Sequence, residues 1–589
     1  MKSLKVHLRV AKKAKGIRNN LNGTFDIETW GLEPKAFAIG VVIYELNGQL
    51  IKARFSDPKK MFKYMTGYTF RGYTWWGHNV EYDLLGICEN PLTEFDKCIY
   101  AKSNFILAIK KIGKNTIRFQ DSYNLFKTSL KQIGKAMGYT KLDTPDKFTL
   151  GLRSKITEKD WLYCERDCEI VLKAVNQFKS WIFDNFHCNI GCTIASTALK
   201  VWQTNWGVDI YVDKYVNAAF RKSYYGGRTE VFIKGHVETL MNYYDINSLY
   251  PYVYSKIRFP DPSRMKSGSG LKAFKKVIEN ERYEGTAFIE IYTEQEIPIL
   301  PVRIDGKLLF PRGVIRGNYN FNEIRYALSN GYKIIDAGEF LYSPYIDSPF
   351  DEYVRDIYSK RLEYQSVGNG MGEEFCKRLL NHLYGKFGEM RDGSEWGEWC
   401  NPIPGKYFEE VRSGWGYWKF RDCKETQTDH TIFAFCSYVT SAARIELHKL
   451  MRKVEQKGGE VYYCDTDSVI CDVDLPVSKE LGDIKLEGLV VDGVILKPKQ
   501  YELTFADGSI HRKMKGIPSR CMPDTLFANT IIVDRYVKSK EGIRRGLRAG
   551  EKLRVTKRNN YGENDKRIFD LVGVDLEVSC VKSTPICLA

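Results

Sequence analysis

The sequence has 589 residues, of which 43% are hydrophobic and 28% charged, a composition that excludes a largely disordered chain and predicts about four domain-sized units. The net charge of +16 favours a polyanionic partner, with nucleic acid ahead of an anionic membrane. No apolar run reaches the roughly 20 residues needed to span a bilayer, so no membrane association is expected. The fifteen cysteines lack the paired Cys and His spacing of a zinc site, which indicates reduced thiols.

Residues 1–22 form a basic arm, in which seven Lys and Arg between Lys2 and Arg18 are accompanied by no acid. We expect this arm to contact phosphate or to form a solvated strand. A mitochondrial targeting peptide is an alternative, although such peptides are usually rich in serine.

Residues 23–190 alternate strand-like and helical stretches, which is typical of an α/β domain. The first strand reads "TFDIETW", and its alternation places Asp26 and Glu28 on one face while Phe25 and Ile27 anchor the other. Taken alone, this pattern also fits a half-buried strand with a solvated acidic face.

Two further pairs of polar residues have helical spacing. Asn79 and Asp83 lie four residues apart where a helix is expected to start, and Tyr163 and Asp167 lie four apart on an amphipathic helix. Each pair alone fits an ordinary helix surface. Four carboxylates in this order, however, would need cations if the fold brought them together.

The order Asp-x-Glu, Asn-x-x-x-Asp, Tyr-x-x-x-Asp resembles the three motifs of the DnaQ-like 3′–5′ exonucleases, which have a ribonuclease-H-like fold. The resemblance implies that Tyr163 orients the attacking water and that His78 and Asn79 lie beside the single-stranded end. It also implies two Mg²⁺ ions, for which Mn²⁺ can substitute, because the ligands are all oxygen. Those ligands would be Asp26, Glu28, Asp83 and Asp167.

A second set of carboxylates follows a linker at 191–235. Asp245 lies in the strand-like "YYDINSLYP", five residues before Tyr250, and Asp465 and Asp467 lie in the aromatic strand "YYCDTDSV". Two acids so close together repel each other, which predicts a positive charge between them.

The stretch "CKRLLNHLYGKFG" is predicted to be a helix that carries Lys377, Asn381 and Tyr384 on one face. Lysine and tyrosine on one face suit a triphosphate and a base or sugar, although an ordinary amphipathic helix has the same pattern. Gly385 would be unfavourable inside a helix by about 1 kcal/mol, and the close approach of a base pair would explain it.

These three stretches resemble motifs A, B and C of the family B DNA polymerases. Tyr225, Gly226 and Gly227 resemble that family's YGG linker motif, and the pair Lys499 and Tyr501 resembles its K-x-Y motif. Lys513 lies in a segment similar to a primer-contacting one. The resemblance spans about residues 24–516, and the placement of two insertions is most like the protein-primed subgroup of small phages and linear plasmids.

The resemblance implies an α/β and α+β multidomain chain, in which the exonuclease domain precedes a right-hand polymerase domain of palm, fingers and thumb with two palm insertions. The expected division is an arm at 1–22, the exonuclease domain at 23–190, the linker at 191–235, palm at 236–255, the first insertion at 256–345, fingers and motif B at 346–392, the second insertion at 393–424, palm at 425–505, and thumb with the C-terminal region at 506–589.

The resemblance also assigns roles to these residues. The metal ligands for synthesis would be Asp245, Asp467 and the Ile246 carbonyl, with Asp465 close by. The side chains that would contact the bound nucleotide are Tyr250, Lys377, Asn381 and Tyr384. The residues that would contact primer or template DNA are Lys499, Tyr501 and Lys513, together with Tyr225, Gly226 and Gly227 of the YGG motif.

Four features depart from the family pattern. The first exonuclease motif begins about a dozen residues later than in the compact phage members, because of the basic arm. His382 stands where small hydroxylated residues are common, residues 396–418 are rich in Trp, and the fingers lysine before motif B is ambiguous between Lys360 and its neighbour Arg361.

The sequence therefore predicts a template-directed DNA polymerase with a proofreading exonuclease, which replicates a linear viral or plasmid genome by protein priming with strand displacement. The implied partners are primer-template DNA, single-stranded DNA, dNTPs and a terminal protein, and a monomer in the host cytoplasm is expected, with a mitochondrial linear plasmid as the other setting. The alternatives are a conventional or primer-independent family B polymerase, a stand-alone 3′–5′ exonuclease, and a non-catalytic nucleic-acid-binding scaffold.

Overall fold

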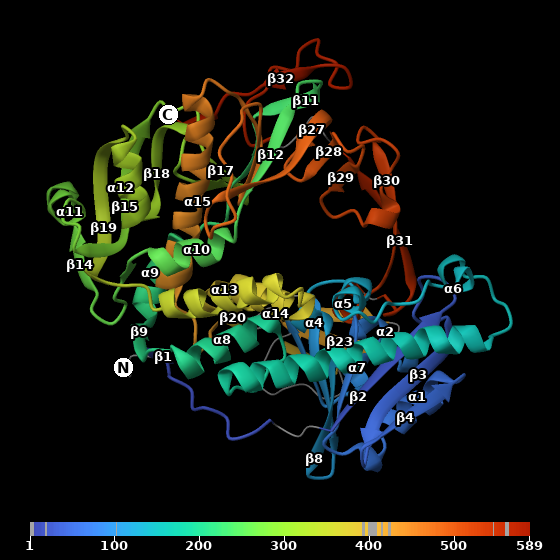
Figure 1. Cartoon of the computed structure of the whole chain (residues 1–589). Coiled ribbons are helices and arrows are strands. Elements are labelled where there is room, and N and C mark those ends of the chain that lie inside the picture. Colours follow the sequence, from blue (N-terminus) through green and yellow to red (C-terminus); the bar gives the residue numbers. More distant parts are fainter. Residues whose placement is uncertain are drawn as a thin grey trace.

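A computed structural model describes residues 5–17, 21–101, 103–391, 395–398, 409–413, 416–421, 426–545, 547–559 and 565–588. Within the predicted second insertion (393–424) it describes only the backbone of three strands, β21 (Glu395–Glu398), β22 (Glu409–Ser413) and β23 (Gly416–Arg421), so the rest of that insertion and its Trp side chains lie outside the described residues. The N-terminal elements form the lower part of the molecule in Figure 1, and the strands that carry the second carboxylate set lie above them.

The N-terminal part is built on a seven-stranded mixed sheet in the order β4-β3-β2-β5-β8-β7-β6. Its three central strands, β2, β5 and β8, run parallel, and Asn22, Thr74 and Arg118 occupy matching positions on them. The strands are β2 (Asn22–Thr29), β3 (Phe37–Leu46), β4 (Gln49–Phe55), β5 (Thr74–Gly77), β6 (Lys97–Ala101), β7 (Asn104–Ile112) and β8 (Asn115–Asp121).

Helices cover both faces of this sheet. The longest, α7 (Glu158–Phe186), begins at a capping box between Thr157 and Asp160 and packs along β2 and β3. The other helices of the N-terminal part are α1 (Pro58–Met65), α2 (Val80–Ile87), α3 (Pro91–Glu94), α4 (Tyr123–Phe126), α5 (Leu130–Ala136), α6 (Asp146–Leu150) and α8 (Ile194–Asn205), of which α5 and α8 pack on helices rather than on the sheet.

The basic arm is partly structured. Strand β1 (Lys5–Leu8) pairs antiparallel with β9 (Ile210–Asp213), which precedes α9 (Lys214–Lys222). Within the described part of the arm, the predicted strand is therefore present, and it is paired with the linker rather than isolated.

The second carboxylate set lies on a nine-stranded sheet with the path β10-β25-β26-β12-β27-β11-β32, to which β28 and β29 are added beside β27. One face of it is covered by α15 (Phe433–Gln456), a helix buried along most of its length. The strands are β10 (Thr229–Val231), β11 (Ile233–Val237), β12 (Met241–Ile246), β25 (Val461–Asp465), β26 (Ser468–Cys471), β27 (Ile484–Lys497), β28 (Gln500–Phe505), β29 (Ile510–Met514) and β32 (Cys580–Lys582).

A separate six-stranded sheet is formed mainly by the chain that follows β12. Its path is β13-β19-β15-β18-β33, with β14 beside β19. The C-terminal strand β33 closes it in parallel with β18. Its elements are β13 (Phe259–Pro260), β14 (Lys266–Ser269), α11 (Leu271–Ile278), β15 (Tyr283–Thr293), β18 (Arg312–Asn320), α12 (Phe321–Ser329), β19 (Lys333–Ile346) and β33 (Cys587–Leu588), and the hairpin of β16 (Val302–Ile304) and β17 (Lys307–Leu309) lies nearby.

Two antiparallel helices, α13 (Asp351–Ser366) and α14 (Gly370–His382), lie between the two halves of the molecule. Phe375 of α14 packs against Phe178 of α7 with ring centroids 4.7 Å apart, so one hydrophobic core joins the N-terminal sheet to α13 and α14. The remaining elements are α10 (Leu249–Lys256), the pair β20 (Met390–Arg391) and β24 (Thr426–Gln427), and, near the C-terminus, β30 (Thr530–Tyr536), α16 (Ser539–Arg545) and β31 (Lys552–Arg558).

Candidate active sites

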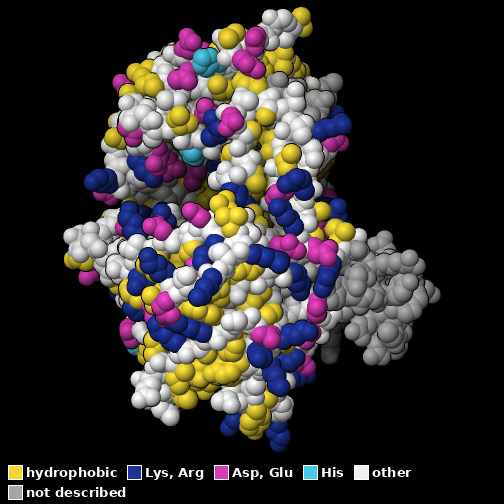
Figure 2. Space-filling view, turned by 90° about the vertical axis from the view of Figure 1, so that its right-hand side faces the viewer, with side chains coloured by type: hydrophobic (Ala, Val, Ile, Leu, Met, Phe, Trp, Pro, Cys, Tyr) yellow, Lys and Arg dark blue, Asp and Glu magenta, His cyan; other side chains and the backbone are white. Residues whose placement is uncertain are grey.

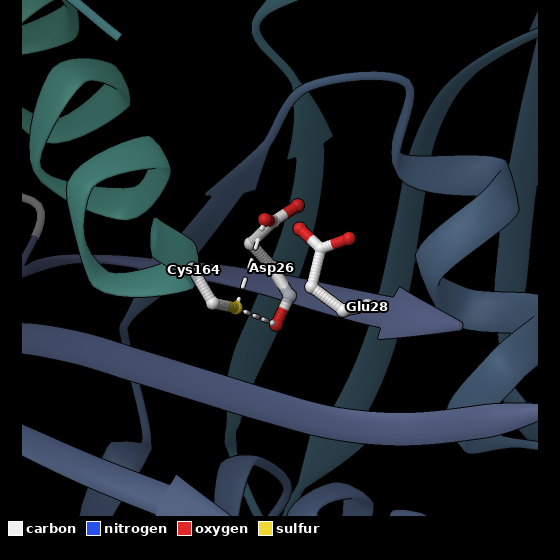
Figure 3. Close-up of side chains that lie close together, drawn as sticks. All are labelled: Asp26, Glu28 and Cys164. Atoms are coloured by element: carbon white, nitrogen blue, oxygen red, sulfur yellow. Dashed lines mark hydrogen bonds between the residues drawn. The ribbon is translucent and has the colours of Figure 1, made fainter. Parts of the chain in front are cut away.

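The N-terminal carboxylates meet beside α7. Asp26 and Glu28 project from β2, and with the Cys164 sulfur of α7 their ligand atoms lie within 4.8 Å of one another (Figure 3). Burial, and then the charge of Asp167, raise the pKa of Asp26 to about 7. Burial, and then the charge of Asp26, likewise raise the pKa values of Glu28 and Asp83. The four predicted carboxylates are therefore one electrostatic cluster.

A lysine absent from the sequence prediction partly neutralises this cluster. Lys141 donates a hydrogen bond to Asp167 and lies 4.6 Å from the centre of the Tyr163 ring. Although burial lowers the pKa of Lys141, the charge of Asp167 raises it above its ordinary value, so the ammonium is retained. The Tyr163 hydroxyl is 2.8 Å from the Thr144 hydroxyl.

The predicted helix-start residues lie at the carboxyl end of β5, beside the cluster. Asn79 precedes α2 in a left-handed conformation (φ 69°), which asparagine tolerates better than most residues, so it lies before the helix rather than on its face. The backbone N–H of Asn79 donates to Asp121 Oδ1 at 2.9 Å. His78 Nδ1 is 3.0 Å from the Ser122 hydroxyl, and burial lowers the pKa of His78 to about 4, so this ring is neutral.

The residues of this site fit a pair of divalent cations. Asp83 Oδ2 and Asp167 Oδ1 are buried and accept no hydrogen bond within the described part of the chain, and buried carboxylate oxygens without partners are costly unless a cation binds them. The Cys164 thiol lies 3.7 Å from Asp26 Oδ2, and burial raises its pKa. It therefore stays protonated and leaves an oxygen donor set, which suits Mg²⁺ or Mn²⁺.

The second set of carboxylates converges across two neighbouring strands. Asp245 lies near the end of β12 opposite Ser468 of β26, while Asp467 lies in the turn between β25 and β26. The Ile246 amide donates to the Asp467 carbonyl at 2.7 Å. Burial, and then the charge of Asp245, raise the pKa of Asp467 to about 7, and Lys485 Nζ lies 3.3 Å from Asp245 Oδ1.

Asp465 has different partners from the other two acids. Its carboxylate accepts hydrogen bonds from Lys499 Nζ at 2.8 and 2.9 Å and from the Thr229 hydroxyl at 2.9 Å, and Lys513 Nζ lies 4.0 Å away. The positive charge that the sequence requires beside these acids is therefore supplied to Asp465 by lysine. Asp467 has no ion pair among the described residues, and Asp245 shares Lys485 with Glu487, so these two acids are the pair left for a bound cation. Tyr501 is buried, and its ring packs on Tyr463 of β25.

The predicted nucleotide-contacting residues lie beside these acids, but not all on one helix. Lys377 and Asn381 are exposed on α14, which ends at His382, and Tyr384 lies in the following 3₁₀ turn (Tyr384–Gly388). The expectation of a continuous helix through Tyr384 and Gly385 is therefore wrong, because the chain tightens after His382. The tighter turn stacks the Tyr384 ring on Tyr250, with centroids 4.4 Å apart.

The two candidates for the fingers cation lie side by side on α13. Arg361 reaches the motif A loop, where it donates to the Ser248 hydroxyl at 3.3 Å, and it also pairs with Glu373 at 3.2 Å. Lys360 is close enough to Cys376 on α14 to influence its pKa. Arg361 is thus the one of the two with a direct contact to the carboxylate-bearing segment.

The YGG loop lies against motif C. A Cβ added to Gly227 would lie 3.0 Å from the Thr466 side chain, so the absence of a side chain permits this approach. Arg444 of α15 holds the loop by donating to the carbonyls of Tyr225 and Gly226 at 3.0 and 2.9 Å. The same guanidinium pairs with Glu323 of α12.

Sequence reasoning missed several of these residues. Cys164 could have been found, because it follows Tyr163 and lies three residues before Asp167 on the same helix. Lys141, Arg444 and Lys485 carry no local signal, since each meets its acid only through the tertiary fold.

Among the described residues, no helix combines the length and apolarity that crossing a bilayer would require. All thirteen cysteines that the structure describes are unpaired, in agreement with the expectation of reduced thiols.

Comparison with known proteins gives relatives of one kind. The family "DNA polymerase type B, organellar and viral" matches residues 146–395. A probable DNA polymerase of Podospora anserina is 25% identical over 72% of this chain and 41% of its own length. The DNA-directed DNA polymerase of Enterobacteria phage PRD1 is 27% identical over 68% of each chain. This chain therefore spans less than half the length of the Podospora relative.

A solved structure of Phi29 DNA polymerase superimposes with a TM-score of 0.69 at 17% identity, covering 92% of this chain and 100% of that one. Another, of the same polymerase with primer-template DNA, gives a TM-score of 0.70 at 16% identity. The predicted multidomain architecture is thus confirmed at the level of the fold. Together with the matched sequence family, these comparisons confirm the predicted resemblance: the chain is similar to the family B DNA polymerases of organelles and viruses.

Proposed function

We propose that this chain is a template-directed DNA polymerase with a 3′–5′ proofreading exonuclease. The observation that carries the proposal is the presence of two separate carboxylate clusters on two separate sheets, Asp26 with Glu28 on one and Asp245 with Asp467 on the other. Each lies beside a lysine and a tyrosine. Divalent ions bound at each cluster would supply Lewis-acid activation and charge neutralisation for phosphoryl transfer.

In synthesis, the chain would hold the reacting groups around Asp245 and Asp467. Burial raises the pKa of Asp245, and the charge of Lys377 is close enough to offset part of that rise. Lys377 would therefore place its ammonium near the transferred phosphate. The stacked rings of Tyr250 and Tyr384 form an apolar wall beside the acids, against which the sugar and base of an incoming nucleotide would pack.

Lys499 would change partners during the cycle. In the structure its ammonium is paired with Asp465, and it is more than a third exposed, so a primer phosphate could compete for it. The Lys499 backbone is held in a left-handed turn (φ 62°) by the Tyr463 hydroxyl, which accepts from its amide at 3.0 Å. This turn keeps the ammonium at the end of β25. Asn381, Lys513 and the YGG loop are the further contacts that we assign to nucleotide and DNA.

In degradation, the acids of the N-terminal cluster would hold the scissile phosphate through the bound ions. The Tyr163 hydroxyl would orient the attacking water. Lys141 would hold Asp167 in position through its hydrogen bond and Tyr163 through the contact of its ammonium with the ring. His78 is neutral and Asn79 is held at the carboxyl end of β5, where a single-stranded 3′ end would enter. Many Lys and Arg side chains cover the lower half of the face shown in Figure 2, which suits a polyanionic substrate.

We further propose that the chain replicates a linear viral or plasmid genome by protein priming with strand displacement, in the host cytoplasm or in mitochondria. Support comes from the organellar and viral family and from the phage and fungal relatives. The six-stranded subdomain between β13 and β19 would receive a terminal protein. A conventional or primer-independent polymerase would have the same two clusters and is the second candidate.

Separate inactivation of the two clusters tests the central proposal. Asp467→Ala is expected to abolish nucleotide incorporation on a primed template while single-strand degradation continues. Asp26→Ala combined with Glu28→Ala should give the reverse. If the chain were a stand-alone exonuclease, the unmodified protein would incorporate no nucleotide. If it were a non-catalytic scaffold, the unmodified protein would show neither incorporation nor degradation. Retained incorporation in Asp467→Ala would falsify the polymerase assignment.

The initiation mode is tested with dNTPs supplied together with a primed template, a bare template, or a template with a candidate terminal protein. Protein priming predicts covalent labelling of the terminal protein by a labelled dNTP. Synthesis on a bare template, with neither a primer nor a terminal protein, would instead identify a primer-independent enzyme.

A further inference from the structure

A cavity of about 110 Å³ lies along β5 and β8 of the N-terminal sheet, where α7 and α8 face these strands. It is lined by residues of two parallel strands, Thr74 and Trp76 of β5 and Arg118 of β8, and by Lys179 of α7 and Lys200 of α8. Its volume is several times the roughly 10–15 Å³ that one water needs on the same scale.

The cavity is cationic. Three of the residues that line it are Arg118, Lys179 and Lys200, and none of the described lining residues is an acid. Within the described chain, Lys179 Nζ donates to the Asn22 amide oxygen at 2.7 Å and Lys200 Nζ to the Ile190 carbonyl at 3.3 Å, while the Arg118 guanidinium has no hydrogen bond or ion pair. Burial lowers the pKa of Lys179 to about 8 because no described carboxylate compensates its charge.

A buried hydroxyl in the same cavity also lacks a partner. Thr74 is 2% exposed, and its Oγ1 makes no hydrogen bond to any described residue. Buried hydroxyls are nearly always satisfied, so an orphan beside three cations indicates a polar ligand. A hydroxyl and three cationic groups around one small space together present donors for a multivalent oxyanion.

We propose that this cavity binds a phosphate group, held by Lys179, Arg118 and the Thr74 hydroxyl, with Lys200 at its exposed side. The group could belong to a free phosphate anion or to the terminal phosphate of a nucleic acid strand, since both present the same oxygens. The site is distinct from the carboxylate cluster. Lys179 lies twelve positions after Asp167 on α7, which corresponds to about 18 Å along the helix.

The site exists independently of the proposed polymerase and exonuclease activities, so it is tested by binding alone. The full chain is titrated calorimetrically with inorganic phosphate in the presence of EDTA, which removes divalent ions from both carboxylate clusters. Lys179→Met and Arg118→Gln are expected to weaken phosphate binding by about tenfold or more, because each removes a charge-assisted contact. Thr74→Val, which keeps the side-chain shape, should weaken it by a smaller factor.

The matched control is Lys60→Met, which removes the same charge from an exposed position on α1, away from the cavity. It should bind phosphate as the unmodified chain does. Thermal unfolding of each variant shows whether it is folded, and Thr74→Val provides a test even if the charge variants are unstable.

Two arms distinguish the source of the phosphate. A 5′-phosphorylated trinucleotide that displaces phosphate more strongly than its 5′-hydroxyl counterpart would identify a strand end, and equal failure of both would identify a free anion. The proposal is overturned if the unmodified chain binds no phosphate in EDTA, or if the cavity variants bind it as tightly as Lys60→Met does.

Discussion

Arg444 is predicted to hold together three segments, and its replacement by methionine tests this role. The guanidinium makes two hydrogen bonds of 2.8 Å to Glu323 and also donates to the YGG carbonyls. Both side chains of the ion pair are 0% exposed. Arg444→Met would keep the length of the side chain but leave a carboxylate buried without its cation.

The size of the effect follows from the protonation of Glu323. Burial raises the pKa of this carboxyl above its ordinary value of 4.5, and Arg444 opposes that effect. Without Arg444 the buried carboxyl takes up a proton instead of remaining charged. At pH 7 that protonation costs about 3.4 kcal/mol relative to the unfolded chain, which agrees with the roughly 3–5 kcal/mol measured when one partner of a buried pair is removed.

This mechanism gives the loss of stability a definite pH dependence. In Arg444→Met, the folded state binds nearly one proton more than the unfolded state between about one pH unit above 4.5 and the raised pKa of the buried carboxyl, so stability falls in that range as pH rises, by about 1.4 kcal/mol per pH unit. The free energy of unfolding is measured by urea titration, followed by tryptophan fluorescence, at pH 5.5 and 7.0. The deficit of the variant relative to the unmodified chain should be larger at pH 7.0 by up to about 2 kcal/mol, and the full difference applies where Arg444 keeps Glu323 ionised at both pH values.

The double variant Glu323→Gln with Arg444→Met removes the titrating group and is the control. It should show the same deficit at both pH values. A deficit of Arg444→Met that does not change between pH 5.5 and 7.0 would refute the reasoning. The loop contacts predict a second result: incorporation on a primed template should fall in both variants, while single-strand degradation should not.

Three further outcomes are expected. Lys499→Ala leaves Asp465 without its ammonium partner, so incorporation should fall by roughly tenfold or more, with degradation unchanged in the same preparation. Lys141→Ala should have the opposite selectivity because it releases Asp167, and a gel assay on single-stranded DNA should show a loss of about tenfold or more with normal incorporation. Chelation with EDTA should stop both activities and Mg²⁺ should restore both; activity of either kind in EDTA would contradict a metal-dependent mechanism.

Much of the architecture could be predicted from local patterns. The alternation of β2 placed Asp26 and Glu28 on one face, and four-residue spacing placed Tyr163 and Asp167 on one face of α7. Such predictions succeed because strand and helix periods fix side-chain direction before any tertiary contact forms. The end of α14 before Tyr384 was not predicted, since the residues that follow, among them Gly385, tighten the chain into a 3₁₀ turn.

The sequence by itself therefore determined the strand or helix face on which each acid lies, because spacing is a local property of the chain, and the resemblance to known motifs grouped the acids into two clusters. Only the tertiary structure decided how their charges are balanced. Lys499 reaches Asp465 from 34 residues away and Lys141 reaches Asp167 from 26 residues away, and Arg444 reaches Tyr225 across 219 residues. Hydrogen-bond partners of this kind depend on how sheets and helices pack, and no period of the sequence records them.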